Sequence, residues 1–206
     1  MQSLENQFLI AMPSMGDPFF NKTVTYICEH NDEGAMGLII NLPVNICLND
    51  LLKQIDDEAD SEAQVGIVDD NHLDKQQKEN SSLLASLEQP VLSGGPISQN
   101  RGFVLHSTQQ GWKSSLALSK DIMITTSKDI LLALGTKNAP EKFMVTLGYA
   151  GWGPGQLEEE LKENSWLTIE ANSDIIFKTP IEQRWQKATE MFGIDVAHLS
   201  SDVGHA

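Results

Sequence analysis

Several things are scarce in this chain of 206 residues, and each absence narrows the class of protein. Only two cysteines occur, Cys28 and Cys47, and they form no CxxC pair. This argues against a disulfide scaffold or a zinc finger, and we expect Cys28 to be a reduced thiol buried in a strand. No apolar run approaches the roughly 20 residues of a membrane-spanning helix, and the N-terminus lacks the basic start of a signal peptide. We therefore predict a cytoplasmic protein without a membrane partner.

Positive charge is also scarce. Fourteen lysines and arginines face 29 aspartates and glutamates, a net charge of −15. Phosphate backbones are bound by clustered cations, so we expect no direct contact with nucleic acid. Residues 56–88 hold ten acids and two lysines, a net −8, and we expect no other part of the chain to reverse the sign locally. The acidic segment favours a solvated surface loop or insertion, with one short strand at Val65 to Val68.

Forty per cent apolar residues is enough for a core, and the length predicts a single domain spanning residues 1–206. Runs rich in β-branched and aromatic residues indicate strands, and Thr179-Pro180-Ile181-Glu182 is typical of a helix start with a capping box. We expect strands at 7–12, 23–30, 35–42, 90–92, 101–106, 122–125, 143–148, 166–169 and 175–177, and helices at 49–55, 128–134, 154–163 and from 180 onward. Hairpins outnumber βαβ units, so the predicted class is α+β with a mixed, largely antiparallel sheet.

The segment from Phe143 to Trp166 is the strongest candidate for a site. An apolar run leads into closely spaced glycines and then into a helix signature, an order that can present free backbone N–H groups to an anion. We call residues 151–155 the glycine turn. Its candidate ligand-binding residues, with the residue that follows it, are Gly151, Trp152, Gly153, Gly155 and Gln156. The spacing matches no nucleotide-binding motif. The alternative is a tight structural turn with Trp152 packed in the core.

A second candidate lies on the strand at 23–30. Cys28 and His30 are two positions apart, so we expect them to share one face of that strand, with His106 at the end of another strand. A thiolate–imidazole pair or a metal site would need these groups together. No second ligand pair with metal-like spacing occurs, so we predict no metal, no cofactor and no catalytic residue, and favour strand burial for both side chains.

Three blocks of sequence carry a family resemblance. They are FLIAMPSMGDPFFNKTVTYICEHNDEGAMGLIINLP (8–43), SGGPISQNRGFVLHS (93–107) and LGYAGWGPGQLEEELKENSWL (147–167), and the match continues through FKTPIEQRW (177–185). The chain resembles the YqgE/AlgH family of bacterial proteins. That resemblance implies an α/β fold with a branched or barrel-like sheet surrounded by helices, in a bacterial cytosolic protein. It implies no established reaction and no catalytic residues, and one branch of the family carries the label of a transcriptional regulator of alginate production.

Three hypotheses for function remain open. The first is a non-enzymatic regulatory protein that acts through protein partners, as a monomer or a homo-oligomer. The second is a protein or enzyme that holds a small anionic metabolite at the glycine turn 151–155. The third is direct DNA binding, which the charge of −15 makes the least favoured.

Overall fold

The computed structural model describes residues 3–13, 15–60 and 86–193. Its helices are α1 (Leu48–Asp60), α3 (Lys128–Ala133), α4 (Gln156–Lys162), α5 (Ser173–Phe177) and α6 (Arg184–Met191), with a 3₁₀ turn, η1 (Ile181–Gln183), directly before α6. Its strands are β1 (Gln7–Ala11), β2 (Val24–Asn31), β3 (Gly34–Ile39), β4 (Pro43–Cys47), β5 (Pro90–Ser93), β6 (Ile97–His106), β7 (Ser115–Ala117), β8 (Met123–Thr125), β9 (Phe143–Trp152) and β10 (Trp166–Glu170).

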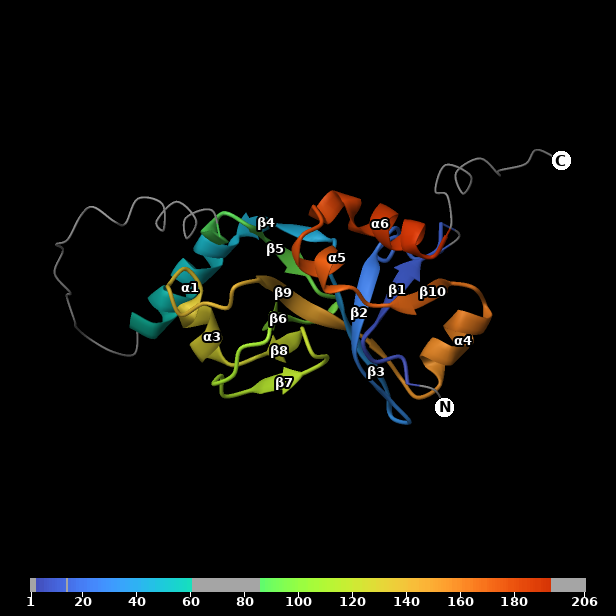
Figure 1. Cartoon of the computed structure of the whole chain (residues 1–206), viewed down its shortest axis with the longest axis horizontal. Helices are drawn as coiled ribbons and strands as arrows, with labels where there is room; N and C mark the ends of the chain where they lie inside the picture. The colour runs from blue at the N-terminus through green and yellow to red at the C-terminus, as the bar shows by residue number, and fades with distance from the viewer. Residues whose placement is uncertain (1–2, 14, 61–85, 194–206) are drawn as a thin grey trace.

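One curved sheet organises the molecule (Figure 1). Its strand order is β10-β1-β2-β3-β9-β6-β8-β7, and β5 leaves this path by pairing with both β4 and β9. All pairs are antiparallel except β5 with β9, which is parallel. The predicted class is confirmed: the protein is α+β, with a mixed, largely antiparallel and branched sheet.

Strand β9 forms the branch because its two halves pair with different strands. Residues 143–147 and Tyr149 pair with β6, residues 146 and 147 also pair with β5, and residues 150–152 pair with β3. Gly148 lies close to this change of partner at φ +72°, a backbone conformation that residues with a side chain rarely adopt. A Cβ on Gly94 would lie only 2.2 Å from the carbonyl oxygen of Gly148. The glycines of two family motifs therefore allow two backbones to pass in direct contact.

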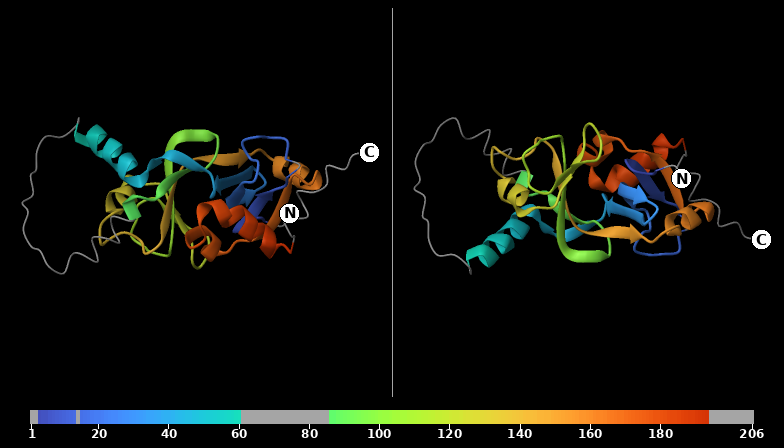
Figure 2. Two further views of the ribbon diagram at one scale, coloured as in Figure 1. Left: turned by 90° about the horizontal axis from the view of Figure 1, so that it is seen from above. Right: turned by 90° about the horizontal axis from the view of Figure 1, so that it is seen from below.

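Helices cover the sheet in three places, each over its own apolar cluster. Helices α5 and α6 cover the cluster that contains Tyr26 and Trp185, and α4 covers the cluster of Trp152 and Trp166. Helices α1 and α3 pack beside Ile130 in the third cluster. Figures 1 and 2 show α1 and α4 at opposite ends of the long axis, so these two helices enclose separate parts of the core.

The structure corrects several predicted elements. Residues 175–177 belong to helix α5 instead of a strand, because the side chain of Asn172 accepts a hydrogen bond from the Asp174 N–H and caps a helical turn. Strands β4 and β7 were not predicted, and α1 extends to Asp60, five residues into the expected acidic loop. The predicted strand at Val65 to Val68 lies outside the described residues. Within the described part of the chain, no helix has the length and apolar character needed to cross a membrane.

The predicted capping box at residue 179 is also wrong. Thr179 donates its hydroxyl proton to the carbonyl oxygen of Asp174, and the following turn begins at Pro180 without a side-chain cap. The apolar face of α6 is buried at Trp185 and Ala188, whereas Phe192, just after the helix, is 44% exposed. Helix α6 is therefore held by burial of its side chains, including Arg184 in the first turn, and not by a side-chain cap.

Candidate functional site

The predicted glycine turn is shorter in the structure than in the sequence analysis. Gly151 and Trp152 are the last residues of β9, where they pair with Met36 and Ala35 of β3. Their backbone is therefore part of the sheet ladder. Of the five candidate residues, only Gly153, Gly155 and Gln156 belong to the connection into α4 and its first residue.

Protein groups already bind two of the backbone N–H groups of this connection. The N–H of Gly153 donates to Oε1 of Gln156 at 3.0 Å, and the N–H of Gln156 donates to the carbonyl oxygen of Gly153 at 3.1 Å. Gly155 sits at φ +76° and starts α4, which is only seven residues long. The Gly153 N–H, which the ligand hypothesis needs free for an anion, is instead capped by the side chain of Gln156.

Trp152 is also held inside the protein. Its indole is 7% exposed, and its Nε1–H donates to Oε2 of Glu160 at 2.9 Å. The same carboxylate oxygen accepts from Nε1 of Trp166 at 2.8 Å, and the two indole rings meet edge to face with centroids 6.0 Å apart. The ring of Trp152 therefore serves the packing of α4 on the sheet, as the structural alternative predicted.

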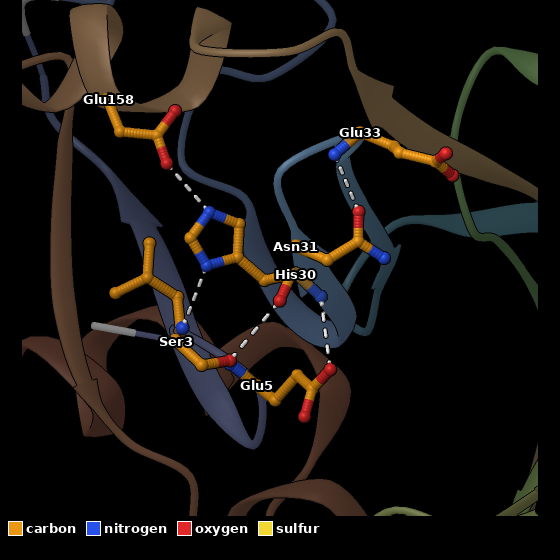
Figure 3. A network of polar contacts seen from close by, with 7 residues as sticks. Ser3, Glu5, His30, Asn31, Glu33 and Glu158 are labelled. Atoms are coloured by element: carbon orange, nitrogen blue, oxygen red, sulfur yellow. Dashed lines mark hydrogen bonds and ion pairs between the residues drawn. The ribbon is translucent and has the colours of Figure 1, made fainter. Parts of the chain in front are cut away.

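The second candidate, Cys28 with His30, is separated by a β-bulge. The register of β2 against β3 shifts between Ile27 and Glu29, so Cys28 has no direct partner. Cys28 and Glu29 both line one cavity together with Met36. His30 points to the other face of the sheet, toward α4 (Figure 3). The expectation that Cys28 and His30 share a face is wrong, because the extra residue reverses the alternation of side chains.

His30 is the centre of a polar network, shown in Figure 3. Its Nδ1 accepts the N–H of Leu4 at 3.0 Å, so the neutral ring carries its proton on Nε2, which lies 2.7 Å from Oε1 of Glu158. Burial raises the pKa of the Glu158 carboxyl, but hydrogen bonds from its own backbone and from His30, with the charges of His30 and Lys162, bring that pKa below its ordinary value. The network ties the N-terminal segment and α4 to β2.

The other two members of the second candidate, Cys28 and His106, are also buried. Burial, and then the charge of Glu29, raise the pKa of the Cys28 thiol well above its ordinary value, so Cys28 is a protonated thiol at neutral pH. His106 is fully buried, and its two ring nitrogens lie 2.9 Å from the carbonyl oxygen of Ser107 and 2.8 Å from Oγ1 of Thr125. In the described part of the chain, no group of three metal-binding side chains occurs.

A cavity of the described residues lies elsewhere, between the bulge of β2 and strands β6 to β8. It has a volume of about 520 Å³, within the range of small-molecule sites. Its wall is mostly apolar and includes Phe103 and Tyr149, whose rings meet edge to face at 5.9 Å. Two cations, Arg101 and Lys113, and one acid, Glu29, also line it. An apolar wall with a few charged groups suits a ligand that is both apolar and charged.

The charge pattern of the sequence contained a signal for this cavity that we did not use. Residues 97–142 carry six lysines and arginines against three aspartates and glutamates, a net charge of +3 in a chain of −15. The expectation that no window reverses the sign is therefore wrong. Arg101 and Lys113 both belong to this segment, and the fold brings them to one cavity because β6 and β7 both pair with β8.

These features define an α+β protein with a curved, branched sheet and an open cavity near one end of that sheet. A model of the AlgH-like family matches residues 8–197, and the chain belongs to this family. A UPF0301 protein of Colwellia psychrerythraea is 69% identical over the full length of both chains. A UPF0301 protein of Vibrio cholerae is 50% identical over 99% of this chain and all of its own.

Solved structures agree with the fold. The solution structure of the AlgH protein from Pseudomonas aeruginosa matches with a TM-score of 0.72 and 38% identity, and covers all of both chains. A crystal structure from Corynebacterium diphtheriae matches with a TM-score of 0.67 over 98% of this chain and 93% of its own, at 16% identity, which shows likeness of fold alone. The family is uncharacterised, so function has to be argued from the site.

Proposed function

We propose that this protein is a non-catalytic regulatory protein that binds a small amphipathic anion in the cavity beside Arg101. The proposal keeps the anionic metabolite of the second hypothesis and moves its site from the glycine turn to the cavity. It keeps the regulatory role of the first hypothesis and makes occupancy of the cavity the regulatory signal.

The state of Arg101 carries the proposal. The chain has only two arginines. Arg184 is structural: it is buried, donates to the carbonyl oxygens of Thr179 and Ile40, and its pKa is lowered by burial to about 10. Arg101 is exposed, stacks with its guanidinium carbon 5.3 Å from the centre of the Phe103 ring, and has no ion pair with an acid of residues 3–13, 15–60 or 86–193. A guanidinium placed over an aromatic ring keeps its N–H fork for a carboxylate or phosphate.

The side chains near the cavity favour binding of a ligand there over a catalysed reaction. The Cys28 thiol at the cavity wall is held in its protonated form, which is a poor nucleophile. The ring nitrogens of His30 are occupied by Leu4 and Glu158 on the opposite face of the sheet. Neither group is placed to act as a nucleophile or a base on a molecule in the cavity.

A fluorescent anion tests the proposal. The probe is 8-anilinonaphthalene-1-sulfonate, which joins two apolar aromatic groups to one negative charge. We expect saturable binding to the folded protein that Arg101→Gln weakens at least fivefold and Arg101→Lys weakens less, because lysine keeps the charge but not the planar fork. The control Lys162→Gln removes the same charge from α4, at the other end of the molecule. Equal weakening by Arg101→Gln and Lys162→Gln would show that the probe responds only to net charge and would reject the site.

A protein partner fits the rim of the same cavity. Leu116 is 60% exposed there, on β7, which pairs only with β8 among the described strands. An unpaired strand edge beside an exposed leucine is a surface that another chain can extend. We expect a photo-crosslinking residue at position 116 to capture a partner protein in the native bacterium. The same residue at position 132, where Leu132 is 54% exposed, is the control. Equal capture from both positions would contradict a specific contact at β7.

Direct DNA binding keeps the least support. The excess of cations in residues 97–142 is only three charges within a chain of −15. We expect no gel retardation at low salt and micromolar protein, and a retarded complex under those conditions would restore the third hypothesis.

A further inference from the structure

A chain of hydrogen bonds leads from the buried interior to the cavity wall. Thr125 on β8 lies directly opposite Ser115 on β7, and His106 on β6 lies diagonally from Thr125, two positions beyond its partner Val104. Oγ1 of Thr125 lies 2.8 Å from Nε2 of His106 and 2.9 Å from Oγ of Ser115. Ser115 is the member that lines the cavity.

The carbonyl group of Ser107, at the buried end of this series of hydrogen bonds, fixes the direction of every bond in the series. The carbonyl oxygen of Ser107 can only accept, so Nδ1 of His106 carries a proton and donates it at 2.9 Å. Burial lowers the pKa of His106, more than its hydrogen bond to Ser107 raises it, so the ring is neutral and Nε2 can only accept. Thr125 has one hydroxyl proton and donates it to Nε2. The bond between Thr125 and Ser115 must then use the proton of Ser115.

Ser115 consequently offers the cavity only its lone pairs. Glu29, the acid in the same cavity, is also an acceptor: one of its oxygens takes an N–H from Asn31 at 2.9 Å, and the other is not used by that bond. The cavity therefore combines two cations, Arg101 and Lys113, with two groups that can only accept; the hydroxyls of Ser114, Thr126 and Tyr149 in the same wall can donate or accept. A ligand that brings only an anionic group would leave both acceptors without a partner, which costs free energy when they are covered.

We infer that the ligand is an aromatic or similarly apolar carboxylate that also carries its own hydrogen-bond donor, a hydroxyl or an amino group, which binds Ser115. The inference rests on the proposed function, since it describes the occupant of the same cavity. The carboxylate binds Arg101, the ring packs against the wall formed with Phe103, and the donor completes the chain that ends at Ser107.

Matched probes separate the donor from the anion. The reference is 3-phenylpropionate, which has a ring and a carboxylate but no donor. Phenyllactate adds a hydroxyl beside the carboxylate, phenylalanine adds an ammonium there, and 3-(4-hydroxyphenyl)propionate adds a hydroxyl on the ring. Each is titrated into the full-length protein and followed by NMR. We expect at least one donor-bearing probe to bind about threefold to tenfold tighter than 3-phenylpropionate, the gain from one well-placed hydrogen bond.

Two variants assign that gain to the hydroxyl chain. Ser115→Ala should abolish the preference for the donor-bearing probe and leave 3-phenylpropionate unchanged within about twofold, whereas Ser119→Ala, outside the cavity, should preserve the preference. Thr125→Val should also reduce the preference, because Ser115 is then free to donate to a carboxylate; a thermal melt verifies that this variant is folded.

The outcomes distinguish the inference from the proposed function. Equal affinity for all four probes in the wild-type protein, with weakening by Arg101→Gln, overturns the donor requirement and keeps the anion site. A preference that survives Ser115→Ala overturns the role of Ser115. If none of the four probes binds, and if Arg101→Gln leaves the fluorescence titration with 8-anilinonaphthalene-1-sulfonate unchanged, the anion site itself is overturned.

Discussion

Nε2 of His30 lies 2.7 Å from Oε1 of Glu158 and joins β2 to α4 across 128 positions of sequence. Both ring nitrogens of His30 are occupied, since Nδ1 accepts the N–H of Leu4. The side chain is 2% exposed, and its loss leaves the part-buried N–H of Leu4 and the carboxylate of Glu158 without their partner. Three separate parts of the chain, the N-terminal segment, β2 and α4, are held by this one ring.

We therefore expect His30→Ala to lower the free energy of unfolding by about 2–4 kcal/mol, because a cavity and an unpaired N–H are created together. Glu158→Gln should cost less, since the amide oxygen can still accept from Nε2. Urea denaturation measures both. The control is Glu159→Gln, an exposed neighbour on the same helix, which should change the free energy by less than about 0.5 kcal/mol. An unchanged free energy of unfolding in His30→Ala would show that the network does not stabilise the fold.

The buried His106 predicts a pH dependence of stability. Its pKa in the folded protein is below the ordinary value of 6.5, so the neutral ring is favoured in the fold. The unfolded chain then binds more protons than the folded one as the pH falls, and the stabilisation is complete above about pH 6.5 and decreases below it. His106→Gln should flatten this loss between pH 6.5 and 5, measured by urea denaturation at several pH values. An unchanged slope in the variant would assign the loss to other groups.

The contact between Gly94 and Gly148 predicts a steric limit. A methyl group on Gly94 would meet the carbonyl oxygen of Gly148 at 2.2 Å, so Gly94→Ala has to push β9 away from the end of β5. We expect a loss of about 2–3 kcal/mol in the free energy of unfolding. Gly16→Ala is the matched control, because nothing lies within 4 Å of its Cβ position, and it should change stability by less than about 0.5 kcal/mol. Similar values for the two variants would contradict the close passage of the backbones.

A substitution of Glu160 tests whether Trp152, at the end of the glycine segment, has a structural role. One carboxylate oxygen accepts the indole N–H groups of Trp152 and Trp166, at 2.9 and 2.8 Å. Glu160→Ala should lower the free energy of unfolding by about 2–3 kcal/mol and shift tryptophan fluorescence, because two part-buried N–H groups lose their acceptor. Glu163→Ala, exposed at the end of the same helix, is the control. A fluorescence shift from Glu163→Ala as large as that from Glu160→Ala would contradict the shared acceptor.

Much of the sheet could be predicted because its signals are local. The hairpin of β2 and β3 follows from two apolar runs with a turn between them, and α3 follows from the apolar residues of 128–134, although Ser127 before it makes no side-chain cap. Residues 175–177 were mistaken for a strand because three apolar residues have no period, whereas the cap that decided the matter, Asn172, lies before them.

The candidate site could be predicted only in part. Sequence spacing marked the segment at Gly151 as unusual, but not that its first two residues belong to a strand. Alternation placed Cys28 and His30 on one face, and a single bulged residue separated them. A bulge leaves no mark in local sequence, because it is set by the register against the neighbouring strand.

Composition and local sequence pattern determined the class of the fold and the family. The sequence also determined the charge, which is negative overall and positive within residues 97–142. Tertiary structure alone decided which groups are free. It assigned Arg184 to the core and Arg101 to a cavity, although the residue type is the same. It also joined His106 to Ser115 through Thr125, which no spacing could indicate. The physical reason is that hydrogen-bond partners and burial depend on strands brought together by the sheet, over separations that local sequence does not encode.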